Sequence, residues 1–209
     1  GYGRVVEEDG WLLWACRQRG GRYAAAAEQL AAQIVARQAE DGSWPRDYFG
    51  AGVCGALALA GGLGKEYGAL AREVALKSLA DCDRADYVGV VESGQSAAPG
   101  ARCLGEWAQI LVACGELLRA GAERELKIAA ARAVAAILNY HYHPDLGLLV
   151  EVVSGDFFRF DDQRGTLVHS GAALKALAAL VNEAGRGGEE KLLTLAGDYL
   201  RQHLDGAWD

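Results

Sequence analysis

The chain has 209 residues, of which 51% are hydrophobic, and a formal net charge of −7. This length and composition can bury a substantial core, and we expect one domain over residues 1–209. An acidic chain without a basic block argues against nucleic acid and anionic membranes as partners. No uncharged apolar run approaches the ~20 residues of a membrane helix, and no signal peptide is recognisable, so we expect a soluble, cytoplasmic protein.

The cysteines are odd in number and form no C-x-x-C pair, and four of the five are surrounded by Ala, Leu and Val. This pattern favours reduced thiols acting as small core residues over a disulfide framework or a zinc site. We therefore expect no metal and no cofactor. The five residues are Cys16, Cys54, Cys82, Cys103 and Cys114.

Apolar stretches long enough to be helices are separated by glycine-containing breaks, which predicts a mostly α-helical chain. Four stretches share one register, in which an apolar anchor is followed by a small or apolar residue four and twelve positions later. Such positions lie along one side of a helix, so each copy is predicted to bury the same face. The anchors are Tyr23, Tyr67, Leu126 and Leu192, followed by Ala27, Ala71, Ala130 and Ala196, and then by Val35, Leu79, Leu138 and Leu204.

More uniformly apolar stretches begin at Gly50, Ala101 and Gly165, between the repeated helices. Helices that are apolar all round are buried on both sides. Amphipathic outer helices around such inner helices predict an all-α toroid, or (α/α)6 barrel. Counting 5–18 as the first inner helix gives four hairpins, too few to close a ring of six. The chain also lacks methionine, so we expect a fragment whose remainder follows Asp209.

The segment RQAEDGSWPRDY, 37–48, predicts a turn after an outer helix, because Asp41-Gly42 supplies backbone freedom. Trp44 can fold back to lock this turn or stack on a sugar ring. In GARCLGEWAQ, Arg102 and Glu106 are four residues apart in a predicted inner helix. They can form an ion pair, or face an enclosed lumen where Arg102 holds a sugar oxygen and Trp107 stacks on the ring.

His141 and His143 precede Pro144, where capping of a helix end is favoured over metal binding because no third ligand is apparent. Residues 147–153 and 156–160 predict a short β-hairpin around Ser154-Gly155. Glu151 is then a lone carboxylate in an apolar strand, and is as consistent with a site residue as with a structural one.

The stretch 165–180 contains one charge, Lys175, which either extends to water from the edge of a buried helix or faces the lumen. His169, near the start of this helix, is a candidate cap residue or an acid/base in the lumen.

The segments HPDLGLLVEVVSGDFFRFDDQRGTLVHSGAALKALAALVNEA and YLRQHLDGAWD, within 143–209, resemble the N-acylglucosamine 2-epimerase family. This family includes renin-binding proteins and cellobiose and mannose epimerases. The resemblance implies an (α/α)6 barrel with a small-molecule sugar in its lumen, and it leaves room for a homodimer. It also implies epimerisation at C2 of an open-chain sugar by two acid/base groups.

The resemblance fails at one catalytic position. The family's P-G-H-x-x-E helix start corresponds here to 170–175, where Ala172 replaces the His and Lys175 replaces the Glu. Alanine transfers no proton, so Lys175 or His169 would have to substitute. We therefore expect a sugar epimerase or isomerase relative with an altered site, or a non-catalytic relative that binds a sugar or a protein. A third alternative, an α/α-barrel hydrolase or lyase, would need Asp or Glu residues in the lumen, and the only adjacent aspartate pair, Asp161-Asp162, is explained by a solvated turn.

Overall fold

A computed structural model describes residues 12–13, 15–17, 19–38, 65–89, 100–121 and 123–206. These residues are mostly helical, and the predicted all-α fold is confirmed. Helical elements, in chain order, are η1 (Gly21–Tyr23), α2 (Ala24–Val35), α4 (Lys65–Cys82), α5 (Leu104–Ala120), α6 (Arg124–Ala135), η2 (Ala136–His141), η3 (Gln163–Thr166), α7 (Ser170–Gly187) and α8 (Glu190–Gly206).

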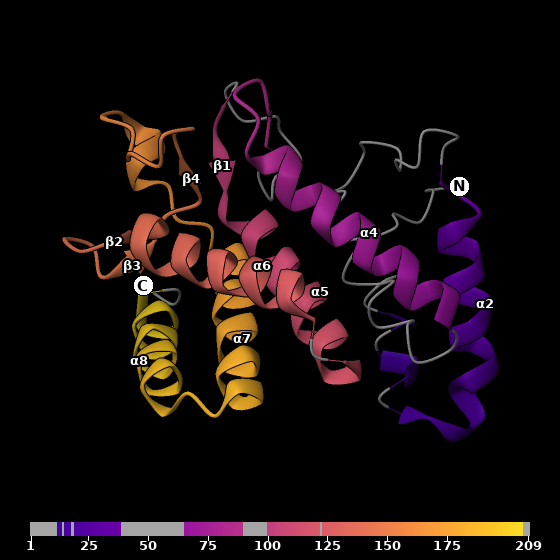
Figure 1. Ribbon diagram of the computed structural model, residues 1–209. Helices are drawn as coiled ribbons and strands as arrows, with labels where there is room; N and C mark the ends of the chain where they lie inside the picture. Colours follow the sequence, from indigo (N-terminus) through magenta and orange to yellow (C-terminus); the bar gives the residue numbers. More distant parts are fainter. Residues whose placement is uncertain are drawn as a thin grey trace, which may run out of the picture.

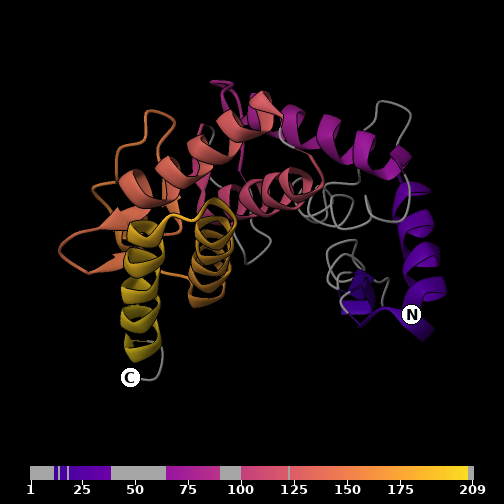
Figure 2. The ribbon, with the colours of Figure 1, turned by 60° about the horizontal axis from the view of Figure 1, so that its bottom comes forward.

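The helices form two layers of an arc. Figure 2 shows α2, α4, α6 and α8 following one another along the outside, with α5 and α7 on the inner side. Helix α5 packs against α4, α6 and α7, and α7 packs in turn against α8 (Figure 1). This arrangement agrees with the expected toroid of outer and inner helices.

Helix α5 occupies the inner layer because its sequence is apolar nearly all round. Leu104, Ile110 and Leu111 are among its fully buried side chains, and they join one hydrophobic core with α6 and α7. Ala113, on another side of the same helix, joins a second core with α2 and α4. A helix that supplies two cores is excluded from solvent on most of its surface.

The outer helices bury the alanines of the predicted stripe, but the residues twelve positions after each anchor differ: Leu79 is buried, Val35 and Leu138 are half-buried, and Leu204 is exposed. The alanines four residues after each anchor are at most 1% exposed, whereas Leu204 is 41% exposed and His203 is buried in its place. At 3.6 residues per turn, eleven residues return to within about 20° of the anchor, while twelve overshoot by about 120°. The predicted face was therefore wrong by one position at Val35, Leu138 and Leu204, where the preceding residues Ile34, Ile137 and His203 are buried instead. The four alanines are Ala27, Ala71, Ala130 and Ala196.

Two short antiparallel sheets connect the layers. Strand β1 (Arg102–Cys103) pairs with β4 (Val152–Val153), and β2 (Tyr142–His143) pairs with β3 (Leu148–Leu149). The prediction of a hairpin around Ser154-Gly155 was wrong. Strand β4 pairs with β1, and the hairpin that does form consists of β2 and β3.

A turn does form at Ser154, whose N–H donates to the Phe158 carbonyl at 2.8 Å, but 156–160 contains no strand. Phe157 in this turn has a φ of 63°, in the left-handed region, which is incompatible with continuing a ladder.

Several predictions fall on residues that the structure does not describe, namely the inner helix from Gly50, Trp44, Cys54 and most of 5–18. Among the described helices, none combines the length and the hydrophobicity that a membrane-crossing segment needs.

Candidate functional site

The starts of the two inner helices are tied together by the backbone of Glu151. The Leu104 N–H, at the start of α5, donates to the Glu151 carbonyl at 2.8 Å. The Glu151 N–H donates to the Leu167 carbonyl, also at 2.8 Å, three residues before α7 begins. The N-termini of α5 and α7 therefore lie close together, and most of the candidate site residues lie near them.

Arg102 is not part of the inner helix, as the sequence suggested, but lies in β1. Its pairing with Val153 holds 102–103 extended, and α5 begins only at Leu104. The guanidinium donates to the Gly100 carbonyl at 2.6 Å and to the Arg84 carbonyl at 3.0 Å. Arg102 and Glu106 thus share no helix face, and the arginine bonds to Arg84, which follows α4, and to Gly100, which precedes β1.

A buried polar cluster forms around Arg102, Glu106 and Tyr87. The Tyr87 hydroxyl donates to a Glu106 carboxylate oxygen at 2.5 Å, and the Arg102 guanidinium lies 5.5 Å from the centre of the Tyr87 ring. Burial, and then the Glu106 charge, raise the pKa of Tyr87. Sequence reasoning missed Tyr87, because a single aromatic residue after an outer helix carries no signal for a contact 19 residues away.

Glu151 belongs to the same region, and its charge raises the pKa of the buried Cys103 thiol, after burial and the charge of Glu106. Arg102, Glu106 and Glu151 are 3%, 5% and 2% exposed. The structure therefore brings the three predicted charges together, but inside the protein, between α4, α5 and β4. In this arrangement they link the residues that follow α4 to β1 and to the start of α5.

Trp107 lies on a different side of α5. The indole is 1% exposed and its ring lies 6.1 Å from that of Phe157, which in turn stacks on Tyr140 at 4.4 Å. In this position the ring is part of the core between α5 and η2.

The start of α7 carries the other two candidates. His169 is the N-cap residue, and its Nδ1 accepts a hydrogen bond from the Ala172 N–H at 3.2 Å. With its Nδ1 lone pair used in this way, the neutral ring carries its proton on Nε2 and can only donate there. Ala172 is fully buried, and Lys175 follows one turn later as a half-buried side chain.

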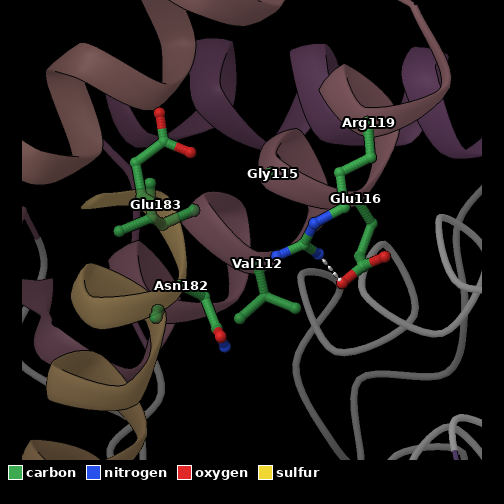
Figure 3. A pocket seen from close by; sticks show the side chains of 8 residues that line it. Val112, Gly115, Glu116, Arg119, Asn182 and Glu183 are labelled. Carbon is green, nitrogen blue, oxygen red and sulfur yellow. Dashed lines mark hydrogen bonds and ion pairs between the residues drawn. The ribbon is translucent and has the colours of Figure 1, made fainter. Parts of the chain in front are cut away.

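A hollow lies between the second halves of α5 and α7 (Figure 3). The hollow is small and partly open to solvent. Asn182 lines it from α7, and Glu116 and Arg119, which form an ion pair, line it from α5. A carboxylate, a guanidinium and an amide supply both donors and acceptors, as a polyhydroxylated ligand requires. Sequence reasoning missed these three residues, although polar side chains ending an apolar helix were a usable signal.

The described cysteines have no catalytic character. Cys16, Cys82, Cys103 and Cys114 are free and buried, as predicted for core thiols. Burial raises the pKa of Cys82 and of Cys114 to about 12, so neither provides a thiolate near neutral pH. No group of three or more metal-binding side chains occurs among the residues that the structure describes.

Of the comparisons with known proteins, the one with solved structures bears on the fold. The sequence matches no protein-family profile and no curated protein. The structure is similar to the crystal structure of a sugar epimerase from a ruminal bacterium, with a TM-score of 0.68 and 16% sequence identity. The match covers 96% of this chain and 59% of the epimerase, so the chain spans about three fifths of that protein's length. At this identity, the likeness shows that the chain has a sugar-epimerase-like fold.

Proposed function

We propose that this chain is a carbohydrate-binding relative of the sugar epimerases that does not transfer the C2 proton at the start of α7. The fold and the resemblance to the N-acylglucosamine 2-epimerase family support a sugar as ligand. The proposal concerns an open-chain or cyclic aldose such as N-acetylglucosamine, mannose or cellobiose.

The observation that carries the loss of catalysis is the arrangement of His169 and Ala172. The resemblance places an acid/base histidine at position 172, where the structure has a fully buried methyl group. We do not expect His169 to replace it as a base, because the lone pair of its neutral ring accepts the hydrogen bond from the Ala172 N–H. General acid–base catalysis typically contributes ~10²–10⁴-fold, and this contribution is missing at the α7 start.

The sugar is proposed to lie along the inner face of α7. Lys175 and Asn182 are seven residues apart, so they lie on one side of the helix, roughly 10 Å from each other along its axis. The hollow lined by Asn182, Glu116 and Arg119 continues this face onto α5. Charged and amide groups at this spacing suit the hydroxyls of one or two sugar rings.

A second candidate function is epimerisation with Lys175 as the acid/base. Its half-buried amine lies one turn after Ala172 on the helix that the resemblance identifies as catalytic. A lysine in such a position can act as a base when burial lowers its pKa. The two functions differ in turnover: the binding relative shows none, whereas the enzyme shows turnover that Lys175→Ala abolishes.

Calorimetric titration with cellobiose and N-acetylglucosamine tests the binding proposal. We expect Asn182→Ala to weaken binding by about tenfold, the effect of losing a ligand hydrogen bond of ~1.4 kcal/mol. Lys191→Ala is the matched control, since Lys191 is exposed on the outer helix α8, and should bind as the parent does. Binding of neither sugar, or equal affinity in the Asn182 and Lys191 variants, would reject the proposed site.

A further inference from the structure

Two buried histidines hold the segment that joins the inner helices. From α8, His203 accepts a hydrogen bond at Nε2 from the Leu149 N–H, at 2.9 Å, and its Nδ1 lies 2.8 Å from the Tyr199 carbonyl. From the end of η2, Nδ1 of His141 lies 2.8 Å from the Val150 carbonyl, and the Val150 N–H donates to the His141 carbonyl at 2.7 Å.

The next residue along the chain is Glu151, whose backbone joins the starts of α5 and α7 through Leu104 and Leu167. The order 149, 150, 151 therefore places two histidine contacts directly beside the junction. A change in the hydrogen bonding of either ring would therefore be transmitted to 149–151 and to the starts of α5 and α7.

The contact of His203 with the Leu149 N–H requires a neutral ring, because an imidazolium has no lone pair, whereas the contact of His141 with the Val150 carbonyl also exists in the protonated ring. Nδ1 of each ring faces a carbonyl and so carries the proton, which leaves Nε2 as the lone-pair nitrogen. Protonation of His203 at Nε2 would set its N–H against the Leu149 N–H. Protonation of His141 would create a buried N–H at Nε2, which has no hydrogen-bond partner among the described residues.

No charged side chain among the described residues contributes to the shifted pKa of either ring. The nearby titratable side chains are Tyr142 of β2, which stacks on Tyr199 at 4.3 Å, and His143. Neither Asp145 and Glu151 near β3 nor the ionisable residues of α7 shift the pKa of either imidazole. Burial alone lowers both pKa values, that of His141 to about 4, against a smaller opposing effect of the backbone hydrogen bonds.

We propose that His141 and His203 form a pH-sensitive clasp on 149–151, which opens on mild acidification and loosens the junction between the starts of α5 and α7. We call these two residues the histidine clasp. They are positioning residues, because they touch the backbone that orders the site rather than a ligand. The clasp itself is independent of the proposed function, whereas its effect on sugar binding rests on that function.

Amide hydrogen exchange at pH 7 and at about pH 5, corrected for the intrinsic exchange rates, measures the opening directly. With a pKa of about 4 in the closed state and 6.5 in the open state, His141 alone should reduce protection roughly 20-fold between pH 7 and pH 5. The loss should be confined to the amides of Leu149, Glu151 and Leu104, while amides in the interior of α5 and α7 keep their protection.

The double variant His141→Asn, His203→Gln retains a donor and an acceptor at the two contacts but does not titrate. It should keep the protection of 149–151 unchanged between the two pH values. His143→Gln, two residues from the clasp, is the control and should behave as the parent does.

Unchanged protection in the parent chain at pH 5 would overturn the clasp, and so would a loss that persists in the double variant. An equal loss throughout α5 and α7 would also overturn it, because this result describes acid unfolding of the whole fold. Cellobiose affinity at both pH values then tests the coupling, which predicts weaker binding at pH 5 in the parent but not in the double variant. Failure to bind cellobiose at either pH counts against the sugar-binding function, whereas the exchange measurement alone decides the clasp.

Discussion

Replacement of Tyr87 by Phe tests whether the buried polar cluster stabilises the fold. The change removes one hydroxyl, which donates to a Glu106 carboxylate oxygen at 2.5 Å, and leaves the ring beneath Arg102 in place. Glu106 is only 5% exposed, so water cannot readily replace the lost donor.

The expected effect follows from the charge of the acceptor. Hydrogen bonds to charged groups contribute about 1.5–3 kcal/mol, so we expect Tyr87→Phe to lower the free energy of unfolding by about 2 kcal/mol. For a urea dependence of about 2 kcal/mol per molar, the midpoint should fall by about 1 M. In a Glu106→Gln background the acceptor is neutral, and the same substitution should cost about half as much.

Urea unfolding followed by circular dichroism measures these differences. Tyr140→Phe is the matched control, because Tyr140 is 40% exposed and its ring packs on Phe157. This control should unfold within about 0.5 kcal/mol of the parent. If Tyr87→Phe is no less stable than Tyr140→Phe, the cluster does not hold the α4–α5 connection.

Three further predictions concern other parts of the fold. Gly165→Ala should destabilise by about 2 kcal/mol or more in the same unfolding assay, because a Cβ there would lie 1.9 Å from the Phe160 carbonyl oxygen. A Cβ added at Gly185, in α7, would have no neighbour within 4 Å, so Gly185→Ala should stabilise the fold by up to about 1 kcal/mol. Equal effects of the two glycine substitutions would contradict this prediction. Cys82 and Cys114, with pKa values of about 12, should resist alkylation by iodoacetamide at pH 8 until the chain unfolds. Mass spectrometry of the alkylated peptides measures this, and rapid alkylation of either cysteine in the native chain would be inconsistent with its burial. The pKa of His141 in the folded chain, about 4, lies below its ordinary value of 6.5. Between these pH values the unfolded state binds more protons, so up to about 3 kcal/mol of the free energy of unfolding should be lost as the pH falls from 6.5 to 4. Unfolding titrations across this range should be flatter for His141→Asn, and an unchanged slope would assign the acid sensitivity to other groups.

The sequence predicted those features that depend on local periodicity. The burial of Ala27, Ala71 and Ala130 follows from the helical repeat and from the need to hide one apolar stripe. The inner position of α5 follows similarly from its apolar surface. Each of these predictions uses residues within one helix, where geometry is fixed by 3.6 residues per turn.

Features that depend on contacts between distant segments could not be predicted. Arg102 is extended rather than helical because it pairs with Val153, 51 positions away in the chain, and no local signal specifies that partner. The contact of Tyr87 with Glu106 and that of His203 with Leu149 are non-local in the same way. Arg102, Glu106 and Glu151 are buried, and whether such charges face a lumen or the interior depends on the packing of α4 against α5, which the sequence does not specify.

One NMR experiment in deuterated water tests most directly whether the chain binds a sugar without transferring its C2 proton. Saturation transfer from protein to cellobiose or N-acetylglucosamine reports binding, and the intensity of the sugar's C2 proton reports exchange in the same sample. We predict saturation transfer with no loss of the C2 signal beyond that in buffer. Loss of the C2 signal that disappears in Lys175→Ala would contradict this account and establish an epimerase with Lys175 as its acid/base.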